Sequence, residues 1–308
     1  MKNLIVSLLL ATSAFALEEH ELTFDHELPS VTDYNAAMQE ALDAQDWWTA
    51  IDYADTIAYL FPDSPFGQEA AYQCGEIYFK MGQYEVANQC FGTYLNQSGS
   101  PKHFEEAIQY KFKIAELYRG GTKMRLFDSH KLPKIVPSEE AAIALYDEVI
   151  TTLPHQEIAA KALLGKAKVQ LSLEDFKDSV ESLQLLIRRF PKHELAAEAY
   201  LEINRVYLQQ CKTEHLDLDL LDLAELNLRK FHLAFPREER LADAQKAMSD
   251  MQELYAANLL DTGGYYERIK KTPASIIYYT KVVAKYPLTK AAQKAREKLE
   301  QFQADSRI

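Results

Sequence analysis

The sequence has few of the residues that interrupt helices, since only 10 of its 308 residues are glycine and 11 are proline. Hydrophobic residues make up 47% of the chain. This balance favours long helices over many short strands joined by turns. No apolar run reaches the roughly 18 residues that a membrane-spanning helix needs. The chain is long enough for two ordinary domains or for one extended array of repeats.

The sequence also lacks the motifs of familiar catalytic sites. It has no phosphate-binding glycine loop, no zinc-type histidine pair on one helix turn, no Cys-x-x-Cys and no Gly-x-Ser-x-Gly. The tripeptide Asp261-Thr262-Gly263 copies that of aspartic proteases, but their chemistry needs two such carboxylates facing each other. We therefore expect no enzyme, with no catalytic residue, no cofactor and no bound metal.

Basic residues are nearly absent from the first third of the chain. Between residues 17 and 100, fifteen acidic residues stand against a single basic one, Lys80, whereas the last 45 residues hold ten basic and four acidic residues. This distribution argues against nucleic-acid binding by the N-terminal half and indicates that the two ends meet different partners. A solvated acidic surface that keeps the protein soluble explains the acidic half equally well.

The first 16 residues have the pattern of a secretory signal peptide. Lys2 precedes a short apolar core, and Ala14-Phe15-Ala16 forms a small-x-small cleavage site. No cysteine follows the apolar core, so we expect the mature protein to lack an N-terminal lipid. Residues 17–30 are acidic and polar, and we interpret them as a flexible linker.

The most informative stretch, residues 71–95, carries small and aromatic residues at fixed intervals. They are Gly75, Tyr78, Gly82, Tyr84, Ala87 and Phe91. This spacing is that of a tetratricopeptide repeat, a helix–turn–helix unit of roughly 34 residues. Gly75 is expected to let the two helices approach closely, Phe91 to fill the seam between them, and Gly82 to end the first helix in a left-handed conformation.

A repeat boundary recurs along the chain, because one such unit cannot bury its apolar face alone. An aromatic residue or leucine precedes proline at Phe61-Pro62, Leu153-Pro154, Phe190-Pro191, Phe235-Pro236 and Tyr286-Pro287. A sixth, degenerate boundary lies near residues 96–101. The prediction is an all-α fold, a superhelical tetratricopeptide-repeat solenoid of about six helix pairs over residues 31–308. Its last long helices are expected near 238–270 and 272–285.

In the best repeat, the register places three residues of the first helix on the concave surface of the solenoid. These are Tyr72, Glu76 and Phe79. An exposed aromatic pair flanking a carboxylate would suit a peptide, so we expect partner binding there. The alternative is that Tyr72 and Phe79 pack against the preceding helix pair.

Residues 119–138 interrupt the third unit with a long insertion for which we expect no regular structure. It carries Arg119, Lys123 and Arg125 together with Phe127, which makes a basic loop with an apolar centre. Long loops inside compact repeats tend to be functional or disordered, so this one is a candidate partner-docking loop. Alternatively, it packs over the edge of the solenoid.

Two of the three cysteines, Cys74 and Cys90, fall on the two helices of the best repeat. A disulfide between them is one prediction for an exported protein. Two buried thiols that behave as small hydrophobic side chains are the other. Cys211 has no evident partner in the sequence.

Two segments resemble a known family, the BamD outer-membrane protein assembly lipoproteins. The N-terminal segment covers residues 41–50, 61–67 and 71–91. In the C-terminal segment the family pattern is matched at Tyr265, Tyr266, Arg268, Pro273, Tyr286 and Pro287. The resemblance extends over about residues 31–302, although the middle aligns only as generic repeats. The chain departs from the family in lacking a lipid-bearing cysteine and in having one helix pair more than the usual five.

The resemblance implies a function and a location. It implies a non-enzymatic scaffold in the periplasm of a Gram-negative bacterium, peripheral to the outer membrane, that helps to insert β-barrel proteins into that membrane. Its implied partners are the β-barrel assembly protein and unfolded outer-membrane proteins, and membrane association would come through partners rather than a lipid. The basic last repeat, with Arg268, Lys270 and Lys271, is the candidate for docking an acidic partner surface. The alternative is an envelope adaptor of the Tol-Pal or peptidoglycan coordination type.

Overall fold

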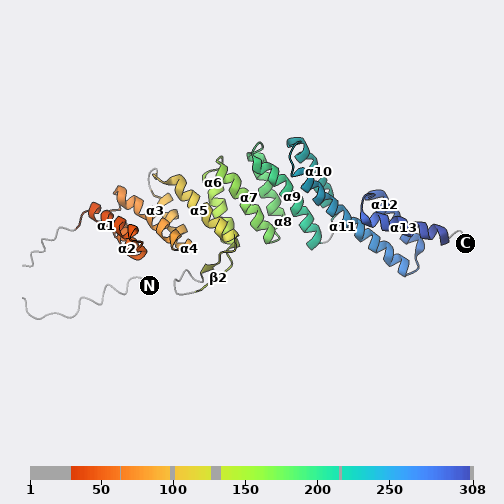
Figure 1. The fold of residues 1–308 in the computed structure, drawn as a ribbon, viewed down its shortest axis with the longest axis horizontal. Helices are drawn as coiled ribbons and strands as arrows, with labels where there is room; N and C mark the ends of the chain where they lie inside the picture. Colours follow the sequence, from red (N-terminus) through yellow and green to blue (C-terminus); the bar gives the residue numbers. More distant parts are fainter. Residues whose placement is uncertain (1–28, 63, 98–100, 126–132, 215–216, 306–308) are drawn as a thin grey trace, which may run out of the picture. The chain divides into compact units, whose positions relative to one another are not determined.

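The computed structural model describes residues 29–62, 64–97, 101–125, 133–214 and 217–305, and within them the chain is helical apart from one small sheet (Figure 1). The signal peptide expected at 1–16 and most of the linker expected at 17–30 lie outside these ranges. The chain divides into two compact units, residues 1–67 and 68–308, which we describe separately.

In the first unit, α1 (Val31–Asp43) packs against α2 (Trp47–Leu60). Ser30 caps α1 through a reciprocal pair of hydrogen bonds with Asp33. The Asp46 side chain caps α2 by accepting a hydrogen bond from the Thr49 amide. The buried residues of the two helices are three alanines and three larger apolar residues: Ala41, Ala50, Ala54, Met38, Ile51 and Ile57.

The remaining helices follow one another along the chain. They are α3 (Pro65–Lys80), α4 (Tyr84–Leu95), α5 (Phe104–Arg119), α6 (Glu139–Thr152), α7 (Glu157–Ser172), α8 (Phe176–Arg189), α9 (Glu194–Thr213), α10 (Leu218–Ala234), α11 (Leu241–Arg268), α12 (Thr272–Lys285) and α13 (Lys290–Asp305).

In the second unit, each helix from α4 onward packs against its sequence neighbour, and the first helices of successive pairs also touch. The contacts of α7 with α5 and α9, and of α11 with α9 and α13, join these first helices into one layer. A large buried apolar cluster runs through the unit from Tyr72 to Ala295, and a smaller one lies around Phe231 between α9, α10 and α11. This nearest-neighbour stacking is the architecture of a tetratricopeptide-repeat solenoid, which confirms the predicted fold class.

The predicted repeat boundaries fall at helix ends. Each residue that precedes a boundary proline is the C-cap of the second helix in its pair, namely Phe61, Leu153, Phe190, Phe235 and Tyr286. The degenerate boundary is capped by Asn96 at the end of α4. The chain thus forms six helix pairs followed by α13, and α12 has the predicted bounds.

The close approach predicted for the best repeat is present in α3 and α4. A Cβ atom on Gly75 would lie 2.6 Å from the ring of Phe91, so only glycine fits at this crossing. Gly82 ends α3 with a φ of 71°, the left-handed conformation that glycine adopts without strain.

The insertion at residues 119–138 has regular structure, so the expectation of a structureless loop is wrong. Its two arms form an antiparallel pair of short strands, β1 (Met124–Arg125) and β2 (Lys134–Val136). The extended backbone of β2 lies between Pro133 and Pro137, residues that disfavour helix at these positions. Pairing satisfies backbone groups that a structureless loop would leave to water.

Candidate partner-binding surface

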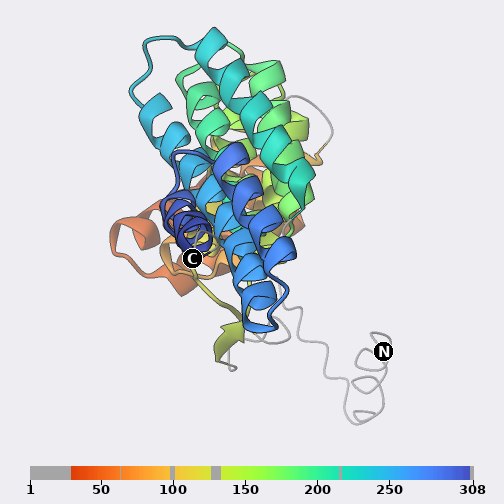
Figure 2. The same cartoon turned by 90° about the vertical axis from the view of Figure 1, so that its right-hand side faces the viewer.

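The helices α11 and α12 pack together as a hairpin (Figure 2). This hairpin exposes large apolar side chains. The exposed fractions are 52% for Tyr265, 41% for Ile269, 37% for Ile276 and 54% for Ile277. α12 buries the stripe of Ser275, Tyr279 and Val282, so its two isoleucines lie off the face that packs into the core. Large apolar side chains that stay exposed on one hairpin are candidates for binding another protein. We call these four residues the hairpin patch.

Aromatic rings connect the two helices of the hairpin beside this patch. The rings of Tyr265 and Tyr266 meet edge to face, 5.5 Å apart, and Tyr266 stacks on Tyr278 at 5.3 Å with the planes 13° apart. The Lys281 ammonium lies 5.2 Å from the centre of the Tyr278 ring, within the range of a cation–π contact. These ring contacts therefore hold together the two helices that carry the hairpin patch.

The predicted basic residues surround the turn of the hairpin. Arg268 is the last residue of α11, and Lys270 and Lys271 form the turn into α12; all three are exposed. Lys270 has a φ of 58°, a left-handed conformation that fixes the direction in which the chain leaves α11. The structure thus places the three predicted basic residues next to the hairpin patch, where apolar and cationic groups could contact one partner.

A buried contact holds the hairpin closed. A Cβ atom on Gly263 would lie 2.6 Å from the ring of Tyr279, and the Tyr279 hydroxyl donates a 2.7 Å hydrogen bond to Glu267. Burial, together with this hydrogen bond, raises the pKa of Tyr279 to about 12. Hydrogen bonds from Tyr279 and Lys298 lower the pKa of Glu267 below its usual range, so the carboxylate stays charged at neutral pH.

Arg268 also lines a groove of about 780 Å³ between α11, α12 and α13. The charged residues of this groove are mixed in sign: Asp261, Glu267, Arg268, Lys294, Glu297 and Lys298. Because carboxylates and cations alternate there, the groove has no strong preference for a ligand of one charge. The stronger binding signal is the hairpin patch with its basic surround.

The expectation that Tyr72 is exposed on α3 is wrong. Tyr72 is only 7% exposed, and its ring stacks on His103 at 4.6 Å. Phe79 packs edge to face on Tyr110 at 5.1 Å, and Glu76 accepts a 2.9 Å hydrogen bond from the Tyr110 hydroxyl. The residues that cover this face belong to α5 and the residue preceding it, in the following helix pair rather than the preceding one. The prediction failed because repeat register alone does not reveal aromatic residues in the next unit.

The described part of the insertion contacts α4 and the residues before it. The Arg125 amide donates a 2.8 Å hydrogen bond to Glu85, and its guanidinium donates one of 3.1 Å to Gln83. Lys134 hydrogen-bonds the Gly82 carbonyl. The base of the insertion therefore packs over the edge of the repeat, as the alternative interpretation held.

Two predicted docking residues of the insertion are exposed. Arg119 forms an ion pair with Glu116 at 2.5 Å and borders a groove of about 270 Å³ between α5, α7 and α9. Lys123 is exposed, whereas Phe127 lies outside the described residues. A docking role for the tip of the insertion stays a prediction.

Cys74 is buried on α3 and Cys90 is half-buried on α4. The disulfide between them stays a prediction. Cys211 is buried, with its sulfur 3.5 Å from the Tyr255 hydroxyl. Burial raises the pKa of the Cys211 thiol, so it stays protonated and packs as a small hydrophobic side chain.

The described residues form neither a membrane-spanning helix nor a cluster of metal-binding side chains. None of the helices they form is both long and apolar enough to cross a membrane. In the same ranges, no group of three or more histidine, cysteine, aspartate or glutamate side chains could hold a metal ion.

Sequence reasoning missed the apolar half of the hairpin surface, the residues Ile269, Ile276 and Ile277. A signal was present, since two consecutive isoleucines cannot both face the core of a helix with a narrow buried stripe. It also missed a groove beside α10. The signal there is the number of leucines in α10, which is larger than one buried helix face can hold.

Comparison with known proteins gives one family match. Residues 137–305 match the family model YfiO, described as "Outer membrane lipoprotein". No curated protein sequence matches the chain.

Solved structures of other repeat proteins are distantly similar. MamA from Desulfovibrio magneticus RS-1 is 15% identical, with 68% of this chain and 97% of that one covered and a TM-score of 0.36. A tetratricopeptide repeat protein from Parabacteroides merdae is 12% identical, with 82% and 92% covered and a TM-score of 0.36. The C-terminal part of a repeat protein from Cytophaga hutchinsonii is 13% identical, with 86% and 87% covered and a TM-score of 0.39. These scores are low, and the fold assignment rests on the helices and their packing.

Proposed function

Because the chain belongs to the YfiO family of outer membrane lipoproteins, we propose that it is a periplasmic scaffold in the assembly of β-barrel proteins into a bacterial outer membrane. Its action is binding rather than catalysis. The partners are the β-barrel assembly protein and unfolded outer-membrane proteins. The protein reaches the membrane through these partners and not through a lipid of its own.

One observation carries the proposal: the hairpin patch and its basic surround lie inside the family-matched segment. A scaffold needs a surface whose apolar groups remain available after folding, and the hairpin keeps four large side chains at least one third exposed. The neighbouring cations Arg268, Lys270 and Lys271 favour an acidic partner surface and speed its approach. We therefore assign docking of the assembly protein to this hairpin.

The test is capture from crosslinked cell envelopes with the full-length protein and its Ile277→Asp variant. A carboxylate at position 277 adds like charge against an acidic partner and removes an apolar contact. The variant is expected to capture at least about tenfold less β-barrel assembly protein than the wild type, because such contacts dominate binding energy. The amount captured is measured by quantitative mass spectrometry.

The matched control is Leu233→Asp, which makes the same kind of change at an 82% exposed apolar residue of α10. It is expected to leave capture unchanged. An equal loss of captured assembly protein in both variants, or no capture of it by the wild type, would contradict the assignment. Capture of a Tol-Pal or peptidoglycan component in place of the assembly protein would favour the envelope-adaptor alternative.

A further inference from the structure

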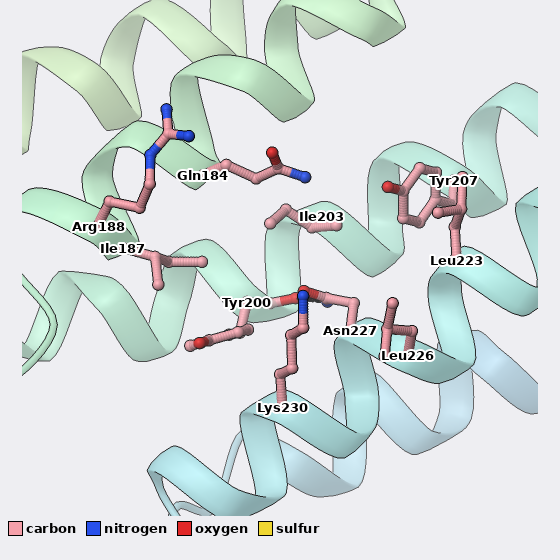
Figure 3. A pocket seen from close by; sticks show the side chains of 10 residues that line it. All are labelled: Gln184, Ile187, Arg188, Tyr200, Ile203, Tyr207, Leu223, Leu226, Asn227 and Lys230. Atoms are coloured by element: carbon pink, nitrogen blue, oxygen red, sulfur yellow. Dashed lines mark hydrogen bonds between the residues drawn. The ribbon is translucent and has the colours of Figure 1, made fainter.

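A second surface lies where α8, α9 and α10 meet (Figure 3). It is a groove of about 410 Å³. Its lining residues are Gln184, Ile187, Arg188, Tyr200, Ile203, Tyr207, Leu223, Leu226, Asn227 and Lys230. The volume is in the range of sites that accommodate a few side chains of a ligand, roughly 300–1,000 Å³. We call it the α10 groove.

The wall formed by α10 is apolar and exposed. Leu223 is 45% exposed and Leu226 is 43% exposed, although both belong to a helix whose buried stripe is made by other residues. Ile203 and Tyr207 of α9 form the floor, and both are buried. An apolar ligand group would therefore remove two leucines from water without displacing any residue of the core.

The groove is held in shape by buried contacts beneath it. The Asn227 side-chain amide donates hydrogen bonds of 2.8 Å to the Tyr200 carbonyl and to the Asn204 side chain, which ties α10 to α9. The Tyr200 ring stacks on Phe231 at 5.3 Å with the planes 6° apart. A site that is already ordered loses less entropy when a ligand binds.

The charge of the groove has one sign. Among its lining residues, Arg188 on α8 and Lys230 on α10 are the basic ones, and Figure 3 shows them on two sides of the groove. Within the part of the chain that the structure describes, no carboxylate lines the groove, and neither cation forms an ion pair or hydrogen bond with another residue. Three other grooves, between α11 and α13, α5 and α9, and α4 and α6, each include at least one carboxylate. In a chain of net charge −12, a purely cationic groove is a selective feature.

We propose that the α10 groove binds an acidic amphipathic segment of a partner protein. Apolar side chains of the segment lie on Leu223, Leu226 and the α9 floor, and its carboxylates pair with Arg188 and Lys230. Two cations flanking an apolar floor match a helix or strand that has leucine-like residues on one side and glutamate or aspartate beside them. This inference does not depend on a role in outer-membrane assembly, because it rests on a different surface.

The test measures peptide binding to the full-length protein by fluorescence anisotropy. Three labelled synthetic peptides of about 15 residues are compared: one pairs leucine with glutamate at helical spacing, the second replaces glutamate with lysine, and the third replaces leucine with serine. Only the leucine–glutamate peptide is expected to bind, and its affinity is expected to fall as salt is added.

Charge reversal locates the site. The double variant Arg188→Glu/Lys230→Glu is expected to weaken binding of the leucine–glutamate peptide at least about tenfold. The matched control is Arg189→Glu/Arg229→Glu, which reverses the adjacent basic residues on the same two helices outside the groove lining. It is expected to change affinity less than about twofold, and circular dichroism melting curves verify that both variants are folded.

Three outcomes would overturn the inference. One is the absence of binding by the leucine–glutamate peptide, and a second is equal binding of the lysine peptide, which would remove the selectivity for acidic segments. The third is an equal loss of affinity in the control double variant, which would mean that binding follows overall charge rather than this groove.

Discussion

Tyr279 joins three helices of the last repeat through a single side chain. Its ring fills the space that Gly263 leaves on α11, its hydroxyl bonds Glu267, and its other side stacks on Phe302 of α13 at 6.2 Å. The Ser275 hydroxyl adds a hydrogen bond of 2.9 Å to the Gly263 carbonyl. The geometry of the hairpin therefore depends on two buried residues, Gly263 and Tyr279, which are not part of the exposed surface that a partner would contact.

Gly263→Ala is expected to lower the free energy of unfolding by about 1–3 kcal/mol, because the added Cβ would lie 2.6 Å from the Tyr279 ring and force it to move. The measurement is urea unfolding followed by circular dichroism.

The neighbouring glycine is the control for this prediction. A Cβ on Gly264 would lie 3.7 Å or more from its nearest neighbours, an ordinary contact distance. Gly264→Ala is expected to be neutral or to stabilise by up to about 1 kcal/mol through helix propensity. Equal destabilisation by both substitutions would contradict the account of Gly263.

At the scale of elements, one turn is used repeatedly at the ends of first helices. In it, a left-handed residue donates its amide to the carbonyl three residues back, and the next residue donates to the carbonyl five residues back. The left-handed residues are Gln45, Gly82, Gly121, Glu174 and Lys270. Glycine occupies this position in only two of the five turns, so the other three carry conformational strain.

Replacing a strained turn residue with glycine is expected to stabilise the fold. Glu174→Gly, at a φ of 63° between α7 and α8, should raise the free energy of unfolding by about 1 kcal/mol. The free energy of unfolding is measured by urea unfolding.

Lys177→Gly provides the contrast, since Lys177 lies in the regular helix α8 and is exposed. The substitution there should destabilise by about 1 kcal/mol. A loss of stability in Glu174→Gly comparable to that in Lys177→Gly would show that the turn does not strain its residue.

The sequence predicted where helices end better than it predicted which helix faces are exposed. Four aromatic–proline steps and one leucine–proline step located five helix ends, because proline cannot continue a helix. The same reasoning missed the turns in which Gln45, Glu174 and Lys270 adopt the left-handed conformation. Glycine is the residue that predicts this conformation from a sequence, and none of the three is glycine.

Surface exposure depends on neighbours that no local pattern reveals. Tyr72 belongs to the aromatic core because His103 and Tyr110 of the following unit cover it. Short strands at 124–125 and 134–136 depend on pairing across an insertion, which a single strand of two or three residues does not indicate. The basic residues of the hairpin were predictable from charge alone, but the patch they surround was not.

At the scale of the whole molecule, the chain is a repeat protein that keeps two separate surfaces exposed, and both combine apolar side chains with cations. The hairpin patch combines apolar groups with a basic turn, and the α10 groove combines exposed leucines with two cations. Each surface lies on neighbouring helices that buried contacts hold together. A scaffold that joins several proteins needs such separate sites, which is the physical reason that the repeat fold suits the proposed role.

The most direct test of that role is the amount of folded β-barrel proteins in the outer membrane after the protein is depleted from its host cells. The account predicts that barrel proteins fall several-fold, measured by heat-modified gel mobility and mass spectrometry of purified outer membranes. The wild-type gene and Leu233→Asp should restore them, while Ile277→Asp should not. Normal barrel levels in depleted cells, with or without a cell-separation defect, would contradict the central claim.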